Sequence, residues 1–131
     1  MRIRVYSDLH LEFAPFVPPP SDADVIVLAG DIDNGAAGIE WAREAFGKPV
    51  LYLAGNHEYY EGEFEAVQEA MGAAARKCSI ELLDCSGAVL DGVQARPDRG
   101  DLSFSRGARC RAKSIRGRSP LRPEAAQASR L

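Results

Sequence analysis

Short apolar runs, separated by polar or amphipathic segments, recur through the first 92 residues of the chain. Residues 25–29 and 50–54 are continuous apolar runs, which are typical of strands buried on both faces of a parallel sheet. Residues 3–6 form a shorter run of residues that favour β-structure. Each of these three runs ends in a polar cluster. The pattern therefore predicts three strands whose carboxyl ends carry polar side chains.

The segment between the second and third predicted strands has helical periodicity. Its apolar residues recur at helical spacing from residue 39 to residue 46, and Asp33 or Asn34 is a candidate cap for the helix N-terminus. A helix here joins two neighbouring parallel strands, which makes a βαβ unit. Four prolines among residues 14–20 predict an extended surface connection between the first two strands.

A second amphipathic helix is predicted over residues 61–77. Acidic residues gather in its first turn and basic residues in its last, which suits the helix dipole at both ends. Two further short strands are predicted at residues 80–83 and 88–90, with a turn at residues 86–87 between them. Because strands and helices alternate up to residue 92, the predicted fold class is α/β.

The charge balance divides the chain into two parts. Residues 1–92 carry 6 Lys and Arg against 16 Asp and Glu, a net charge of -10, whereas residues 93–131 carry 10 against 3, a net charge of +7. Large apolar residues are sparse in the second part, so burial there would not offset the entropy lost on ordering. We therefore expect one α/β domain over residues 1–92, itself incomplete, and a disordered, Arg-rich basic tail over residues 93–131.

Cellular location and redox chemistry are only weakly specified. The apolar runs are far shorter than the ~20 residues that span a bilayer, and the first residues lack the apolar stretch of a secretory signal. A cytoplasmic protein without a membrane partner is the default expectation. Cys78, Cys85 and Cys110 are odd in number and widely spaced, so we expect small buried thiols rather than a disulfide framework.

The polar clusters at the strand ends combine oxygen ligands with imidazole. Asp8 and His10 follow the first strand, Asp31 follows the second, and Asn56 and His57 follow the third. Carboxylate, amide oxygen and neutral histidine suit divalent Mn, Fe or Zn. The second and third clusters each begin with glycine, which permits a tight turn and a close approach of the backbone. The clusters therefore predict a metal site at this edge of the sheet.

These three clusters, in this order and each after a strand, resemble the first half of the calcineurin-like metallophosphoesterases. The resemblance covers residues 1–92 and implies a sandwich of two sheets flanked by helices. It implies that Asp8 and His10 bind the first of two divalent metal ions and that Asp31 bridges both. Asn56 would bind the second ion. His57 would be the catalytic histidine, which donates a proton to the leaving oxygen or stabilises the transition state.

Neighbouring side chains allow more than one role. Asp33 and Asn34 fit a helix cap better than a ligand position. Glu58 could support His57 from behind or be an ordinary solvated carboxylate, and the sequence does not decide between these roles. Tyr59 and Tyr60 could flank a substrate, although partial burial at a helix start is the favoured interpretation.

The chain also departs from the family pattern. The family continues with further histidines, one isolated and then a Gly-His-x-His, whereas His10 and His57 are the two histidines of this chain. The second metal would keep only Asp31 and Asn56. Residues 1–92 also supply too few strands for two packed sheets, so one sheet is expected to expose an apolar face.

A frame change near codon 92 would account for both departures and would make an inactive form the expected product. Translation of the coding DNA in the other two frames tests this hypothesis, because one frame should then encode strand-like segments and a Gly-His-x-His motif. A natural truncation that pairs with another chain is the second explanation.

The predicted function is hydrolysis of a phosphomonoester or phosphodiester by a metal-activated water, with the phosphoester as the partner of the chain. The alternative is a non-catalytic metal- or nucleotide-binding module that regulates another protein. A nucleic-acid-binding role for the basic tail is disfavoured, because Phe104 is the only aromatic residue there that could stack on a base.

Overall fold

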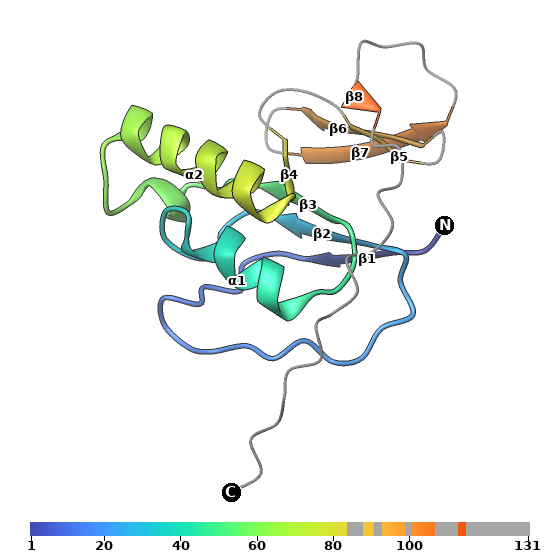
Figure 1. The fold of residues 1–131 in the computed structure, drawn as a ribbon, viewed down its shortest axis with the longest axis horizontal. Coiled ribbons are helices and arrows are strands. Elements are labelled where there is room, and N and C mark those ends of the chain that lie inside the picture. Colours follow the sequence, from blue (N-terminus) through green and yellow to red (C-terminus); the bar gives the residue numbers. More distant parts are fainter. Residues whose placement is uncertain (84–87, 91–92, 99–100, 107–112, 115–131) are drawn as a thin grey trace, which may run out of the picture.

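The computed structural model describes residues 1–83 with their side chains. Beyond them it describes the backbone of four strands, at residues 88–90, 93–98, 101–106 and 113–114. Residues 1–83 contain a parallel sheet and two α-helices, and the later strands form a second sheet (Figure 1). The chain is therefore a mixed α/β protein, as the sequence predicts.

The first sheet is fully parallel, and its strands lie side by side in chain order. The strands are β1 (Ile3–Tyr6), β2 (Val25–Ala29), β3 (Val50–Leu53) and β4 (Glu81–Leu82). Val27 pairs with Val5 on one side and with Leu51 on the other. The three predicted strands are confirmed to within a residue, and their carboxyl ends lie at a common edge of the sheet.

Two helices cover one face of this sheet (Figure 1). They are α1 (Ala37–Ala45), between β2 and β3, and α2 (Phe64–Cys78), between β3 and β4. Ile39 of α1 and Met71 of α2 pack with Tyr52 of β3 in one hydrophobic core. The predicted βαβ unit is confirmed. Within the part of the chain that the structure describes, neither helix is long and apolar enough to cross a bilayer.

The start of α1 differs from the prediction. Ala36 occupies the N-cap position, and no side chain caps the helix. The carboxylate of Asp33 instead accepts a hydrogen bond from the backbone N–H of Asn34, at 2.7 Å. Both residues belong to the loop before α1, so the proposed cap is wrong.

The second helix begins later than predicted, and the two short strands predicted after it do not pair with each other, while the predicted turn at residues 86–87 lies outside the described residues. α2 starts at Phe64, whose side chain is 57% exposed and stacks on Tyr59 with ring centroids 4.6 Å apart. β4 pairs in parallel with β3, whereas the next strand, β5 (Ala88–Leu90), pairs with β6 in the second sheet. The predicted strand pair at residues 80–83 and 88–90 is therefore divided between two sheets.

The second sheet includes part of the segment for which we expected disorder. Its strand order is β7-β6-β5-β8, where β6 is Val93–Asp98, β7 is Asp101–Arg106 and β8 is Lys113–Ser114. β6 and β7 are antiparallel along their full length, so backbone pairing orders a segment with little apolar content. The predicted disorder is therefore not confirmed for these strands, and the rest of residues 93–131 lies outside the described residues. A sandwich of the two sheets is likewise not confirmed.

The sheet face that points away from the helices is also apolar. Val25, Val27 and Leu51 on this face are at most 5% exposed, whereas Val5 at the edge is 51% exposed. The expectation that one face of the sheet would remain exposed is therefore wrong for its central strands. These strands are buried on both faces, as their continuous apolar sequence predicts.

Gly38 offers a test of how tightly α1 packs on the sheet. A Cβ atom there would lie 2.4 Å from the hydroxyl oxygen of Tyr52, which is fully buried, and 3.1 Å from Cγ2 of Ile32. We expect Gly38→Ala to lower the free energy of unfolding by about 1–2 kcal/mol, because overpacking outweighs the gain in helix propensity. Urea denaturation measures this loss.

Gly47→Ala is the matched control, because a Cβ atom at Gly47 would meet nothing within 4 Å. Its free energy of unfolding should stay within about 0.5 kcal/mol of that of the parent chain. Equal midpoints for the two variants would contradict close packing of α1 against Tyr52.

Candidate metal centre

The loops after β1 and β2 run side by side at the carboxyl edge of the sheet. The backbone N–H of Asp8 donates to the carbonyl oxygen of Gly30, and that of His10 donates to the carbonyl oxygen of Asp31, both at 3.0 Å. The pairing of the two strands thus continues into their loops. These bonds bring the first two predicted clusters together, although 22 positions separate Asp8 from Gly30 in the sequence.

Asp8, His10 and Asp31 form a group that could hold a metal ion. Each offers one ligand atom, and the three atoms lie within 4.8 Å of one another. Nε2 of His10 lies 3.9 Å from Oδ1 of Asp8, and the Asp8 side chain is 66% exposed. Two carboxylates and an imidazole suit Mn, Fe or Zn. The structure therefore brings together three of the four residues predicted as ligands.

These three residues also share an uncommon backbone conformation. The φ angles are 55° at Asp8, 47° at His10 and 54° at Asp31, all in the left-handed region. Among the non-glycine residues that the structure describes, Ser79 at the end of α2 is the only other one with positive φ. Such strain is uncommon outside glycine and concentrates at functional sites. The conformation supports a functional role for this group that the sequence alone does not reveal.

Glycine allows the second and third clusters to meet, as predicted. A Cβ atom at Gly55 would lie 2.2 Å from Oδ1 of Asp31 and 2.7 Å from its backbone nitrogen. Gly30 has φ of 91°, and a Cβ atom on it would lie 3.2 Å from Cα of Gly55. The absence of side chains at both positions therefore lets the ends of β2 and β3 touch beside the Asp31 carboxylate.

Asn56 lies next to this group, and its amide can face Asp31 in either of two orientations. With its amide nitrogen toward Asp31, the nitrogen lies 3.2 Å from both carboxylate oxygens. The amide oxygen then accepts a hydrogen bond from the hydroxyl of Tyr60 at 2.6 Å. With the oxygen toward Asp31, as a cation there would require, the amide nitrogen instead donates to the hydroxyl oxygen of Tyr60 at 2.6 Å. Both orientations therefore keep a hydrogen bond with Tyr60.

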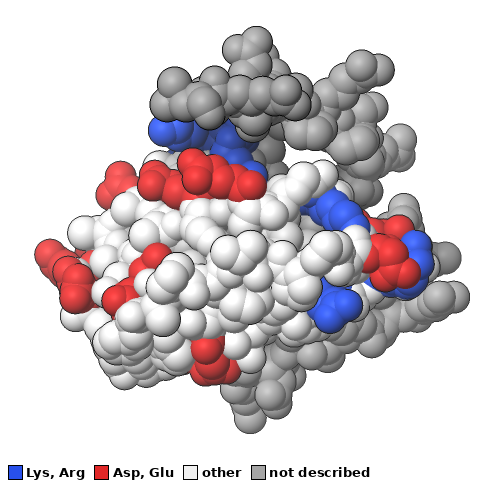
Figure 2. All heavy atoms as spheres, turned by 90° about the horizontal axis from the view of Figure 1, so that it is seen from below, with Lys and Arg blue, Asp and Glu red and all other residues white. Residues whose placement is uncertain are grey.

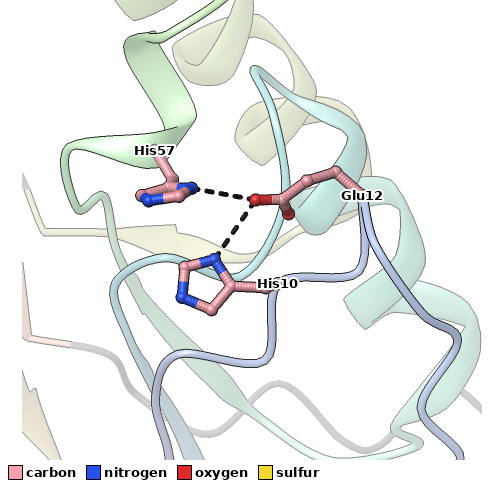
Figure 3. Close-up of side chains that lie close together, drawn as sticks. All are labelled: His10, Glu12 and His57. Carbon is pink, nitrogen blue, oxygen red and sulfur yellow. Dashed lines mark hydrogen bonds and ion pairs between the residues drawn. The ribbon is translucent and has the colours of Figure 1, made fainter.

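His57 lies beside the group and contacts a residue that sequence analysis did not single out. It begins a short 3₁₀ turn (His57–Tyr59), and its backbone N–H donates to Oδ1 of Asp31 at 2.9 Å. Its ring Nδ1 lies 2.9 Å from Oε1 of Glu12, and Nδ1 of His10 lies 3.2 Å from the same oxygen (Figure 3). The two imidazole centroids are 4.3 Å apart. A single carboxylate oxygen therefore contacts both histidines of the chain.

The environment of Glu12 favours its charged form. Burial raises the pKa of the Glu12 carboxyl, but hydrogen bonds from its own backbone N–H and from both histidines outweigh burial, so that the pKa lies below its usual value. The sequence contains a signal for this residue, because Asp8, His10 and Glu12 stand at every second position of the chain.

Glu58 lies inside the protein, which decides between the two roles left open for it. Its side chain is buried, and the residue is 1% exposed. The carboxylate accepts hydrogen bonds from four donors, which are the backbone N–H groups of Asp31, Ile32 and Gly55 and the hydroxyl of Tyr52. Burial and the Glu58 charge raise the pKa of Tyr52 far above its usual range, so its hydroxyl remains a donor. Glu58 is therefore not a solvated carboxylate, and its side-chain hydrogen bonds support the backbone of Asp31 rather than the His57 ring.

A surface pocket adjoins His57 and Glu12. Its volume is about 360 Å³, and it is lined by Glu12, Phe13, Asn34, His57, Tyr60 and Glu61. Tyr60 is 63% exposed, so the prediction of partial burial is wrong for this residue, whereas Tyr59 packs half-buried against the core. His10, Glu12 and His57 form a second group whose ligand atoms lie within 4.8 Å of one another. Asp33 belongs to neither group of possible metal ligands among the described residues.

A comparison with known protein families gives a match over the part of the chain that carries this site. The family model of the calcineurin-like phosphoesterases matches residues 1–89, which include all five predicted site residues. No curated protein and no solved structure gives a significant match.

Glu58→Gln tests whether the buried carboxylate holds the strand ends together. Each oxygen of Glu58 accepts two of its four hydrogen bonds. The amide nitrogen of a glutamine would therefore face either the N–H groups of Asp31 and Gly55, or the N–H of Ile32 beside a Tyr52 hydroxyl that can turn to accept. We expect the free energy of unfolding to fall by about 2–4 kcal/mol, as measured by urea denaturation.

Tyr52→Phe is the comparison, because it removes one donor and leaves the carboxylate in place. It should cost about 1 kcal/mol. A Glu58→Gln variant no less stable than Tyr52→Phe would show that the backbone donors do not depend on this carboxylate.

Proposed function

This chain belongs to the calcineurin-like phosphoesterase family, and we propose that it is a metal-dependent hydrolase that cleaves a phosphomonoester or phosphodiester. The observation that carries this proposal is the cluster of Asp8, His10 and Asp31, whose ligand atoms lie within 4.8 Å of one another. Each of the three residues also adopts a strained backbone conformation. The proposed partner of the chain is a phosphoester.

The residues at the site fit a divalent cation. Asp8, His10 and Asp31 would hold the first ion, and Asp31 with Asn56 would hold a second, with Mn, Fe or Zn as the candidates. When bound, such ions would lower the pKa of a water molecule and offset the negative charge of the phosphoryl oxygens. Because the second position has only two protein ligands among the described residues, the first position is the stronger one.

His57 is the proposed proton donor. Its Nδ1 is engaged by Glu12, so Nε2 is the ring atom that remains for a substrate. His57 also lines the 360 Å³ pocket, where a phosphoester could be bound. From this position a His57 ring that carries a proton on both nitrogens would donate the Nε2 proton to the leaving oxygen or stabilise the charge that develops on it.

The charge of the domain favours a cation at this site. Residues 1–92 have a net charge of -10, and Figure 2 shows acidic side chains in several groups on one face of the molecule. Asp8, Glu12 and Asp31 add negative charge at the site itself. A phosphoester anion would be repelled by these carboxylates at short range. Bound cations would remove this repulsion, so we expect substrate binding to require them.

Hydrolysis by the full chain tests the proposal directly. Purified protein with added Mn²⁺ should release nitrophenol from a nitrophenyl phosphomonoester or from the corresponding diester, and a chelator should abolish the release. Mn²⁺ binding near one equivalent without turnover of either compound would instead favour the non-catalytic metal-binding module.

Asp31→Asn tests the shared ligand. The substitution keeps the shape of the side chain and an oxygen for the His57 N–H but removes the negative charge. We expect Mn²⁺ to bind at least about ten-fold more weakly, with a matching loss of hydrolysis. Isothermal titration calorimetry measures the binding.

Asp33→Asn is the matched control, because it removes a carboxylate two residues away that lies outside both groups of possible ligands. Its Mn²⁺ affinity should stay within about two-fold of the parent chain. Equal affinities for the parent and Asp31→Asn would refute the assignment of Asp31 as a ligand.

A further inference from the structure

One carboxylate oxygen lies between the two imidazole rings of this chain. Oε1 of Glu12 is 3.2 Å from Nδ1 of His10 and 2.9 Å from Nδ1 of His57 (Figure 3). We propose that Glu12 is a positioning residue that accepts a hydrogen bond from Nδ1–H of both histidines and so sets their orientation and tautomer together. This inference rests on the proposed function, because it assigns Nε2 of each ring to the metal or the substrate.

The donor and acceptor pattern leads to this assignment. An ionised carboxylate only accepts hydrogen bonds, so both imidazoles must present Nδ1–H to Glu12. In the neutral ring, Nε2 then carries the lone pair. Nε2 of His10 lies on the side of Asp8, 3.9 Å from its Oδ1, which is the side of the possible metal ligands. A metal-binding histidine commonly donates its other ring N–H to a carboxylate in this way.

Packing restricts both rings in the same arrangement. The ring planes of His10 and His57 meet at 70° with centroids 4.3 Å apart. Phe13 lies beside both, with centroids 6.0 Å from His10 and 6.4 Å from His57. Each histidine ring therefore lies beside the other histidine and Phe13, and its Nδ1 contacts Glu12. A change at Glu12 should free both histidines together.

The burial of Glu12 indicates a role other than stability. Its side chain is only 10% exposed, and Oε2 is buried with no hydrogen-bond partner in the described part of the structure. A buried polar atom without a partner costs free energy, so an apolar residue would suit this position better if only folding mattered. A loss of stability of this kind is expected at a functional site that requires a particular side chain.

The two histidines make the proposal directly measurable. The chain contains only His10 and His57, so a nitrogen-15 NMR spectrum of histidine-labelled protein reports just two imidazoles. At about pH 8.5, where histidine with an ordinary pKa is neutral, we expect the Nδ1–H tautomer for both rings. In Glu12→Ala both should shift to mixtures that contain the Nε2–H tautomer. This measurement needs neither metal nor substrate.

Two further variants separate the hydrogen bond from general damage. Glu12→Gln keeps an acceptor oxygen of the same reach, so it should retain more of the Nδ1–H tautomer than Glu12→Ala. Glu61→Ala removes an exposed carboxylate from the same pocket and should leave both tautomers unchanged. Circular dichroism of each variant verifies that the fold is intact.

Metal affinity provides the second measurement. We expect Glu12→Ala to bind Mn²⁺ about 10–100-fold more weakly, because the His10 ring is no longer held in place, and Glu61→Ala to match the parent chain. Identical tautomers in the parent and Glu12→Ala would overturn the proposal. Weaker Mn²⁺ binding by Glu12→Ala with unchanged tautomers would also overturn it and would make Glu12 a metal ligand. Failure of the parent chain to hydrolyse phosphoesters would refute the proposed function without affecting the tautomer result.

Discussion

The site depends on a buried charge. Glu58 places a carboxylate behind the ends of β2 and β3, where it accepts hydrogen bonds from the backbone of both. Its donors include the N–H of Asp31, whose φ of 54° would be costly without such support. Gly55 completes the arrangement, because a side chain there would overlap the Asp31 carboxylate. The buried charge thus offsets the backbone strain at Asp31, which is the residue proposed to bind a cation.

Much of the fold could be predicted from short-range pattern. The apolar runs at residues 25–29 and 50–54 have the length and continuity of buried parallel strands, and both are observed. The start of α1 could not be predicted in this way, because Asp33 bonds to its neighbour and no side chain caps the helix. The pairing of β4 with β3 is a long-range contact, which a local turn signal at residues 86–87 does not reveal.

The sequence predicted those residues of the candidate site that are both of a metal-binding type and placed just after a strand. Asp8, His10 and Asp31 follow strands whose ends meet, so their proximity follows from a parallel sheet. Glu12 and Glu58 were harder, because their roles depend on burial and on hydrogen bonds across loops. The left-handed backbone of the three possible ligands has no signature in the local sequence. The alternation of Asp8, His10 and Glu12 likewise does not show that one oxygen of Glu12 contacts two rings.

The two proposed metal positions use different parts of this site. The first ligand group comes from the loops after β1 and β2, which the backbone bonds of Asp8 and His10 hold together. The second position relies on Asp31 and on Asn56, whose amide forms a hydrogen bond of 2.6 Å with the Tyr60 hydroxyl in either orientation. Rotation of this amide therefore exchanges one hydrogen bond with Tyr60 for another. A first cation would meet the three possible ligands that already lie together, whereas a second would meet one shared carboxylate and one amide oxygen.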